Sequence, residues 1–289
     1  MKLTLSDFFQ LTKMRLALSV VFSSLAGYFL AAEIINWNSV FLLFIGGYAM
    51  VGASNVYNQL LEKNKDSLMK RTLNRPLPAN RMTYIQALII AILLTIIGVT
   101  SLYFLNLKTA VFGTIAIIIY VFGYTPLKSL TPLSVFIGAI PGAIPYMLGW
   151  VAYSGNFGIE PGVLFMFQFF WQFPHFWAIG WMLDEDYKKA GFKMLPTGKK
   201  DTATAFQIVF YSVWTIVISL LPISSYTGSL SLSFMGGLVV LLLGLFFLFF
   251  GIRLMKNRDD SSAKNLMYAS IFYITFVQII YIMDKIIII

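Results

Sequence analysis

The hydrophobic positions of this chain form long apolar blocks that recur over almost its whole length, separated by short polar connections. The blocks cover residues 14–32, 38–59, 84–105, 109–124, 132–153, 161–183, 203–222, 232–252 and 266–284. An α-helix needs ~20 apolar residues to cross the hydrocarbon core of a bilayer. The pattern therefore predicts an all-α polytopic membrane protein, a bundle of about nine transmembrane helices, with no room for a separate soluble domain.

The composition supports this class and excludes several kinds of chemistry. Hydrophobic residues make up 58% of the chain and charged residues 11%, whereas soluble domains contain about 45–50% and about 25% of these residues. The chain has no cysteine, which excludes disulfides, thiolate metal sites, iron–sulfur clusters and cysteine nucleophiles. Its single histidine, His175, excludes a zinc site built from several histidines.

The net charge of +9 raises the question of a nucleic-acid partner, but the basic residues lie between the apolar blocks and form no nucleic-acid motif. Nine crossings that start in the cytoplasm place all 21 lysines and arginines on the cytoplasmic side except Lys108 and Lys285. This asymmetry is what the positive-inside rule predicts. We therefore expect a cytoplasmic amino terminus, an external carboxyl terminus and no nucleic-acid partner. Most acidic residues fall on the same side, so the chemistry is expected at the cytoplasmic face.

Polar residues at the end of the second block are spaced to share one helix face. Asn55, Gln59, Glu62 and Asp66 follow one another at intervals of 4, 3 and 4, and Asn58 lies close to the same face. If the helix continues this far, it carries one stripe of oxygen ligands suited to Mg²⁺, which takes one or two carboxylates and completes its shell with water and substrate phosphate. The alternative is a helix that merely ends in a solvated polar face.

Basic residues stand where a phosphate group would need them. Lys70, Arg71 and Arg75 follow the acidic stripe directly, and the arginines can bind phosphate oxygens with two nitrogens at once. Lys128 lies alone in the short connection after Tyr124. It is either an orientation signal or a third phosphate contact.

A second polar track runs through the sixth block. Gln168, Gln172 and His175 are spaced at i, i+4 and i+7 among aromatic residues, and the track ends near the acidic residues 184–186. For His175 three interpretations stay open: a neutral histidine hydrogen-bonded inside the bundle, a proton-transfer group, or a ligand to a porphyrin iron.

These segments together resemble the UbiA-type intramembrane prenyltransferases, whose first motif reads Asn-Asp-x-x-Asp-x-x-x-Asp. The matching residues are Asn58, Gln59, Glu62 and Asp66, followed by Lys-Arg-Thr at 70–72 and Asn-Arg-Pro-Leu-Pro at 74–78. The first two aspartates of the motif are thus replaced by glutamine and glutamate. Together with Gln-Phe-Pro-His-Phe-Trp at 172–177 and Glu-Asp-Tyr at 185–187, these replacements resemble the branch that farnesylates haem. The second Asp-x-x-x-Asp motif of the wider family is incomplete, because Met182 stands four residues before Asp186.

The resemblance implies roles for individual residues. It implies a Mg²⁺ site formed by Asn58, Glu62, Asp66 and Asp186, and diphosphate contacts from Arg71, Arg75 and Lys128, with Tyr124 beside them. Glu62, Asp66, Asp186 and Lys128 would be the catalytic set. The resemblance does not indicate how the haem is held, and Gln172 and His175 are our candidates for substrate contact from the polar track of the sixth block.

The resemblance also implies the reaction and its setting. A single integral membrane domain over residues 1–289 would surround a central cavity open to the cytoplasmic face of a bacterial inner membrane. There it would transfer a farnesyl group from farnesyl diphosphate to a vinyl group of protohaem IX (haem B), giving haem O. A partner from the haem pathway or from oxidase assembly is compatible with this role. Two alternatives stay open: a prenyltransferase acting on an aromatic quinone precursor, and a membrane transporter.

Overall fold

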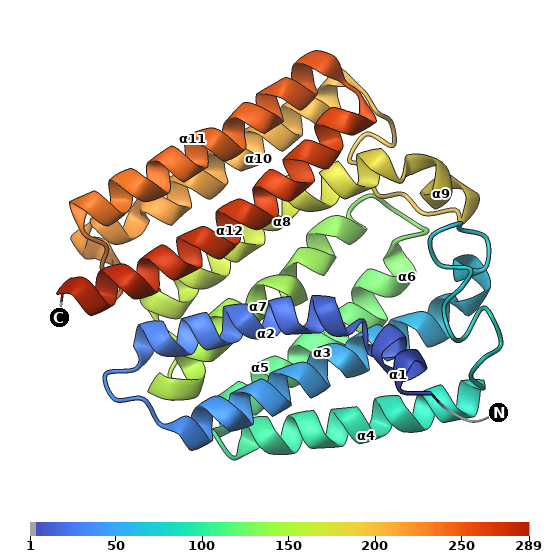
Figure 1. Ribbon diagram of the computed structural model, residues 1–289, viewed down its shortest axis with the longest axis horizontal. Coiled ribbons are helices and arrows are strands. Elements are labelled where there is room, and N and C mark those ends of the chain that lie inside the picture. The colour runs from blue at the N-terminus through green and yellow to red at the C-terminus, as the bar shows by residue number, and fades with distance from the viewer. Residues whose placement is uncertain (1–3, 289) are drawn as a thin grey trace.

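A computed structural model of the chain describes residues 4–288, and every regular element in that range is helical. The elements in chain order are α1 (Leu5–Thr12), α2 (Met14–Ala31), α3 (Trp37–Asp66), α4 (Tyr84–Tyr103), α5 (Leu107–Ile118), the π-helical η1 (Ile119–Tyr124), α6 (Thr125–Leu127), α7 (Ser134–Ser154), α8 (Ile159–Met182), α9 (Asp184–Lys189), α10 (Thr202–Leu220), η2 (Leu221–Ile223), η3 (Ser225–Thr227), α11 (Phe234–Asn257) and α12 (Asp260–Ile288) (Figure 1). The predicted all-α class is confirmed.

The long helices match the predicted apolar blocks. Within residues 4–288, eight helices are long and apolar enough to cross a membrane. The remaining predicted block corresponds to α8, whose 24 residues exceed the ~20 that a crossing needs. Its glutamines, histidine and tryptophans lower its hydropathy, and it packs against α7, α10 and α12. Because α8 is surrounded by protein, it needs less lipid-facing apolar surface than its neighbours.

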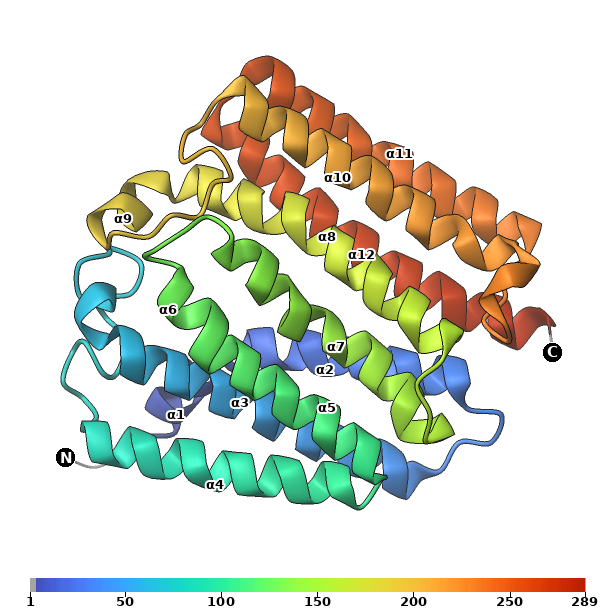
Figure 2. The same cartoon turned by 180° about the vertical axis from the view of Figure 1, so that it is seen from behind.

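The bundle has two groups of helices. Helices α2 to α5 pack with α7 around one apolar core, and α8 packs with α10, α11 and α12 around another (Figures 1 and 2). Helices α2 and α7 approach so closely that a Cβ on Gly27 would lie 2.1 Å from the carbonyl oxygen of Tyr146. A Cβ on Gly149 would likewise lie 1.8 Å from the carbonyl oxygen of Ser24. The missing side chains therefore permit backbone contact at the centre of the bundle.

The connections that are rich in charge all gather at one end of the bundle, which we call the polar end. It contains residues 67–83, 128–133, 183–201 and 258–259, and α1 lies there too (Figure 1). The opposite end carries the connections between α2 and α3, α4 and α5, α7 and α8, and α10 and α11, and α12 ends there. The prediction that the basic connections share one side is confirmed, and the assignment of that side to the cytoplasm stays a prediction.

Candidate active site

A cavity of about 780 Å³ extends from the polar end into the apolar interior. Residues of α2, α3, α4, α5, η1, α7, α8, α9 and α12 line it, together with residues of the polar-end connections. Of the ten residues predicted to act in metal binding, catalysis or substrate binding, nine line it: Asn58, Glu62, Asp66, Arg71, Arg75, Tyr124, Lys128, Gln172 and His175. The two constellations, more than a hundred positions apart in the chain, thus face one cavity.

Two buried ion pairs stand at the polar end of this cavity. Nζ of Lys128 lies 2.6 Å from Oε1 of Glu62, and the two side chains are 9% and 6% exposed. Nη1 of Arg75 lies 2.7 Å from Oδ2 of Asp66, which is 1% exposed. Burial lowers the pKa of Lys128, and the nearby Glu62 carboxylate opposes that shift. Carboxylates on α3 and cations from two different connections are therefore already close together, shielded from bulk water.

The helix that carries the carboxylates continues to Asp66, as the spacing required. The hydroxyl of Thr72 donates to the carbonyl oxygen of Asp66 at 2.7 Å. This contact helps to satisfy the end of α3 and turns the chain back toward the cavity. Arg71 and Arg75 then lie on the returning segment and line the same cavity as the α3 carboxylates.

The polar residues predicted to form one stripe of oxygen ligands have two different roles: some line the cavity, and others bond to α1. Asn58 lines the cavity and donates through Nδ2 to Oγ1 of Thr125 at 3.2 Å, so its amide oxygen stays available. The amides of Gln59 and Asn55 instead donate to the carbonyl oxygens of Leu11 and Thr12, at 2.6 and 3.1 Å. The interpretation of Gln59 as one of the oxygen ligands is wrong, because its amide holds the last turn of α1 and it does not line the cavity.

A π-helical turn shapes the wall opposite α3. Over η1 the helix widens just before Pro126, and Tyr120 and Tyr124 both line the cavity with ring centroids 5.2 Å apart. The ammonium of Lys128 lies 4.7 Å from the centre of the Tyr124 ring, a distance typical of a cation–π contact. Insertions of this kind are frequent at functional sites. Tyr120 was not predicted, although its i, i+4 spacing to Tyr124 was a usable signal.

Helix α9 covers the polar end, but its acidic residues do not join the α3 carboxylates. Tyr187 lines the cavity, whereas Asp186 does not and has its nearest cation, Nζ of Lys189, at 3.9 Å. Burial raises the pKa of the Tyr187 phenol against the lowering effect of Arg71. Among residues 4–288, no three histidine, aspartate or glutamate side chains lie close enough to hold a metal together. The metal role of Asp186 thus stays a prediction from the resemblance.

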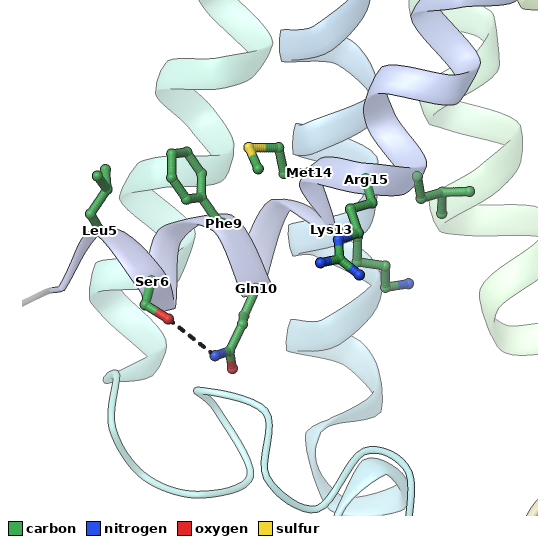
Figure 3. A pocket seen from close by; sticks show the side chains of 8 residues that line it. Leu5, Ser6, Phe9, Gln10, Lys13, Met14 and Arg15 are labelled. Carbon is green, nitrogen blue, oxygen red and sulfur yellow. Dashed lines mark hydrogen bonds between the residues drawn. The ribbon is translucent and has the colours of Figure 1, made fainter.

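Lys13 is a cationic residue of the site that the sequence did not indicate. It joins α1 to α2 in a left-handed conformation, with φ 50° and ψ 55°, which is uncommon for a residue other than glycine. Its side chain lines the cavity, and burial together with the neighbouring charges of Arg75 and Lys128 lowers its pKa to about 7. Lys13 also borders a shallower hollow of about 610 Å³ beneath the break between α1 and α2 (Figure 3). In that view Lys13 and Arg15 point to the same side.

The α8 track lies deeper in the cavity. Nδ1 of His175 is 2.8 Å from Oγ of Ser270, and the imidazole ring stacks on Trp171 at 4.6 Å. Gln172 donates to the carbonyl oxygen of Ala139 at 2.9 Å. The bundle interior therefore satisfies part of each side chain, which agrees with the first of the three interpretations of His175. Both residues still line the cavity, where a bulky substrate would meet them.

The residues present are compatible with a divalent cation that shares its shell with substrate. Glu62 and Asp66 are one turn apart on α3, and Asn58 lies one turn before Glu62. Oε1 of Glu62 is buried without a hydrogen bond of good geometry, in spite of the nearby ammonium of Lys128. Two carboxylates and one amide match the ligand set that Mg²⁺ uses when phosphate oxygens and water complete its shell.

Comparison with known proteins identifies the class of this enzyme. The model of the UbiA prenyltransferase family matches residues 20–277. The chain belongs to this family, and its buried carboxylates and cations stand beside an apolar cavity, as the transfer of a prenyl group requires.

The relatives narrow the class further. The chain is 61% identical over 281 residues to a protein of Christiangramia forsetii named protoheme IX farnesyltransferase, covering 97% of this chain and 94% of that protein. A protein of Flavobacterium psychrophilum with the same name is 57% identical over 283 residues, with coverage of 97% and 94%.

Solved structures share the fold. One described as digeranylgeranylglyceryl phosphate synthase in membranes superposes with a TM-score of 0.79 at 18% identity, covering 97% of this chain and 98% of that one. A UbiA homologue from Archaeoglobus fulgidus bound to GPP and Mg²⁺ gives a TM-score of 0.70 at 15% identity, with coverage of 95% and 99%.

Proposed function

We propose that this chain transfers the farnesyl group of farnesyl diphosphate to a vinyl group of protohaem IX, giving haem O and diphosphate, with Mg²⁺ as cofactor. The observation that carries the proposal is the pair of buried carboxylates on α3, each held by a cation suited to phosphate, at the polar end of an apolar cavity. The names of the two bacterial relatives support haem as the acceptor.

In this proposal Glu62, Asp66 and Asn58 hold the metal, and Arg71, Arg75 and Lys128 bind the diphosphate. A bound Mg²⁺ neutralises the negative charge that develops on the departing diphosphate. Because Lys128 and Arg75 are paired with the carboxylates in the absence of substrate, they are held beside the place where the diphosphate binds. When metal and substrate bind, each cation needs only to turn from its carboxylate to a nearby diphosphate oxygen, which favours catalysis by charges already placed at the site.

The reaction needs no covalent nucleophile from the protein. The C1–O bond of the donor breaks, and its electron pair leaves with the diphosphate. A vinyl carbon of the haem forms the new carbon–carbon bond to C1, and water adds to the resulting cation and loses a proton. Tyr120 and Tyr124 line the cavity, and the negative electrostatic potential of an aromatic ring face can stabilise the positive charge that develops on the allylic carbons.

The shape of the cavity offers separate places for the two substrates. One arm runs along α3 toward α4 and α5 and is lined by buried side chains such as Met50 and Leu102, which are 5% and 0% exposed. The other arm lies between α2 and α12, where the lining residues Phe22 and Ile271 are 38% and 44% exposed on the lipid side. We call the buried arm the closed arm and assign it to the prenyl chain. We call the other the lipid-facing arm and assign it to the haem, which would meet His175 there.

The polar end would face the cytoplasm of a bacterial inner membrane, following the distribution of lysines and arginines. A transporter is disfavoured, because transporters place their ionisable residues near the bilayer midplane. Here the acidic residues of the site lie in the last two turns of α3, at one end of the bundle.

The proposal is tested by expressing the chain in bacterial membranes that contain haem B and farnesyl diphosphate but make no haem O. Extracted haem is separated by chromatography, and its molecular mass is measured by mass spectrometry. With the wild-type chain and with an Asp260→Ala control we expect a more strongly retained haem that is heavier by one farnesyl group and one hydroxyl group. Asp66→Ala should give none. Unmodified haem beside a prenylated small aromatic compound would identify the quinone-type alternative, and no prenylated product at all would refute the proposal.

A further inference from the structure

The closed arm of the cavity ends on a small group of side chains from three helices, which we call the floor. Its members are Met50 of α3, Leu102 of α4 and Gly113 of α5, and all three line the cavity. Leu102 is fully buried and Met50 is 5% exposed. Beyond the floor lies the apolar core that includes the fully buried Leu43. The arm therefore has a definite end.

Glycines hold the floor in place. A Cβ on Gly113 would lie 2.6 Å from Cδ1 of Leu102 and 3.3 Å from Cε of Met50. A Cβ on Gly46 would lie 2.9 Å from Cδ2 of Leu102, and one on Gly98 would lie 2.6 Å from Sδ of Met50. The side chains of Leu102 and Met50 thus pack directly against the backbone at these glycines. The end of the cavity is therefore formed by the flexible side chains of Leu102 and Met50, and not by a helix backbone.

The depth of the arm follows from the helix that forms its wall. Met50 precedes Glu62 by three turns and a third on α3, so about 18 Å of helix axis separates them. An extended farnesyl chain of twelve main-chain carbons is about 14 Å long, from C–C bonds of about 1.5 Å. The link from metal-bound phosphate to C1 takes up about 4 Å more, on the same bond lengths. One more isoprene unit would exceed this depth by about 5 Å, again by bond-length arithmetic.

Resting on the proposed function, we infer that Leu102, Met50 and Gly113 form the stop that selects a farnesyl donor over longer isoprenoid diphosphates. The closed arm can discriminate between donors of different chain length, because a chain longer than farnesyl would clash with the packed apolar core at its end. The lipid-facing arm cannot set a length limit, because its lining residues Phe22 and Ile279 are 38% and 36% exposed and a long chain would continue into lipid.

The experiment compares farnesyl and geranylgeranyl thiodiphosphate, slowly reacting analogues, by Mg²⁺-dependent binding to the purified full chain, and then compares the reactive diphosphates by turnover with haem B. Leu102→Ala deepens the arm and should shift both ratios toward the longer donor by about 10–100-fold, the usual range for a few methylenes in an apolar pocket. Gly113→Ala pushes the leucine into the arm; with geranyl thiodiphosphate added to the comparison, its binding ratio of geranyl to farnesyl should rise above that of the wild-type chain. Leu94→Ala is the matched control, because Leu94 is also buried on α4 and does not line the cavity.

Each ratio is measured within one variant, so a smaller folded fraction does not change it. A binding ratio in Leu102→Ala equal to that of Leu94→Ala overturns the inference. The binding measurement uses no acceptor. If the shift occurs but no haem is prenylated by any variant, the stop is upheld and the proposed function is refuted.

Discussion

The buried pair of Glu62 and Lys128 makes a quantitative prediction about metal binding. Lys128→Met puts a flexible apolar side chain of similar size in place of the lysine and removes the ammonium, together with its cation–π contacts to the rings of Tyr124 and Phe192. It leaves a carboxylate that is 6% exposed without its cation. Breaking a buried pair from one side costs about 3–5 kcal/mol. At about 2–4 °C per kcal/mol, the variant without metal should melt on the order of 10 °C below the unchanged protein.

Added Mg²⁺ should restore most of this loss, because the metal supplies the positive charge that the lysine supplied. At a concentration one hundred times the dissociation constant, binding stabilises the folded state by about 2.7 kcal/mol. The unchanged protein should gain much less, since there the metal must displace Lys128 from Glu62. The assay is thermal unfolding of detergent-purified protein with and without Mg²⁺.

Lys193→Met serves as the control, because Nζ of this exposed lysine contacts only the carbonyl oxygen of Leu130, at 3.2 Å. Its melting temperature should follow that of the unchanged protein under both conditions. Equal Mg²⁺ shifts in Lys128→Met and the unchanged protein would refute the idea that the metal and the lysine compete for Glu62.

Three further predictions address other parts of the structure. With its pKa at about 7, Lys13 loses its charge as the pH rises through neutrality, so donor binding should weaken above about pH 7. Lys13→Met should remove this pH dependence and weaken donor binding about 10–100-fold at pH 6, as expected for the loss of a charged contact. Donor binding is measured by competition, and a pH profile equal to that of the wild-type chain would exclude a contact between Lys13 and the donor. Gln59→Ala leaves a carbonyl of α1 unpaired, at a cost of about 1–3 kcal/mol, and should speed amide hydrogen exchange across α1. Unaltered exchange would contradict the idea that Gln59 stabilises α1. Gly149→Ala places a Cβ 1.8 Å from a carbonyl oxygen of α2 and should lower stability by about 1–3 kcal/mol, unlike Gly162→Ala, whose Cβ has its nearest neighbour at 3.9 Å.

Periodicity and charge predicted the larger part of the fold. Apolar blocks of nearly constant length fixed the number of long helices, because the bilayer sets that length. The spacing of Glu62 and Asp66 placed both on one helix face, and both do line the cavity. These features depend on local geometry within one helix, so a single sequence contains enough information to predict them.

Features that depend on contact between distant segments were not predicted. Gln59 looked like a ligand because it shares a face with Glu62, but α1 packs there and accepts its hydrogen bond. Lys13 lies at a helix break without glycine or proline, so nothing in the local sequence marks the turn. The place of Asp186 relative to the α3 carboxylates likewise depends on how α9 covers the polar end, which one sequence does not encode in any local pattern.

The most direct test of the proposed site is an experimental structure of the chain with Mg²⁺ and farnesyl thiodiphosphate. We expect a metal ion bound by Glu62 and Asp66, with Lys128 and Arg75 moved from the carboxylates to the diphosphate oxygens and the farnesyl chain reaching Leu102. A structure in which both ion pairs persist while metal and diphosphate bind elsewhere would contradict this interpretation of the site.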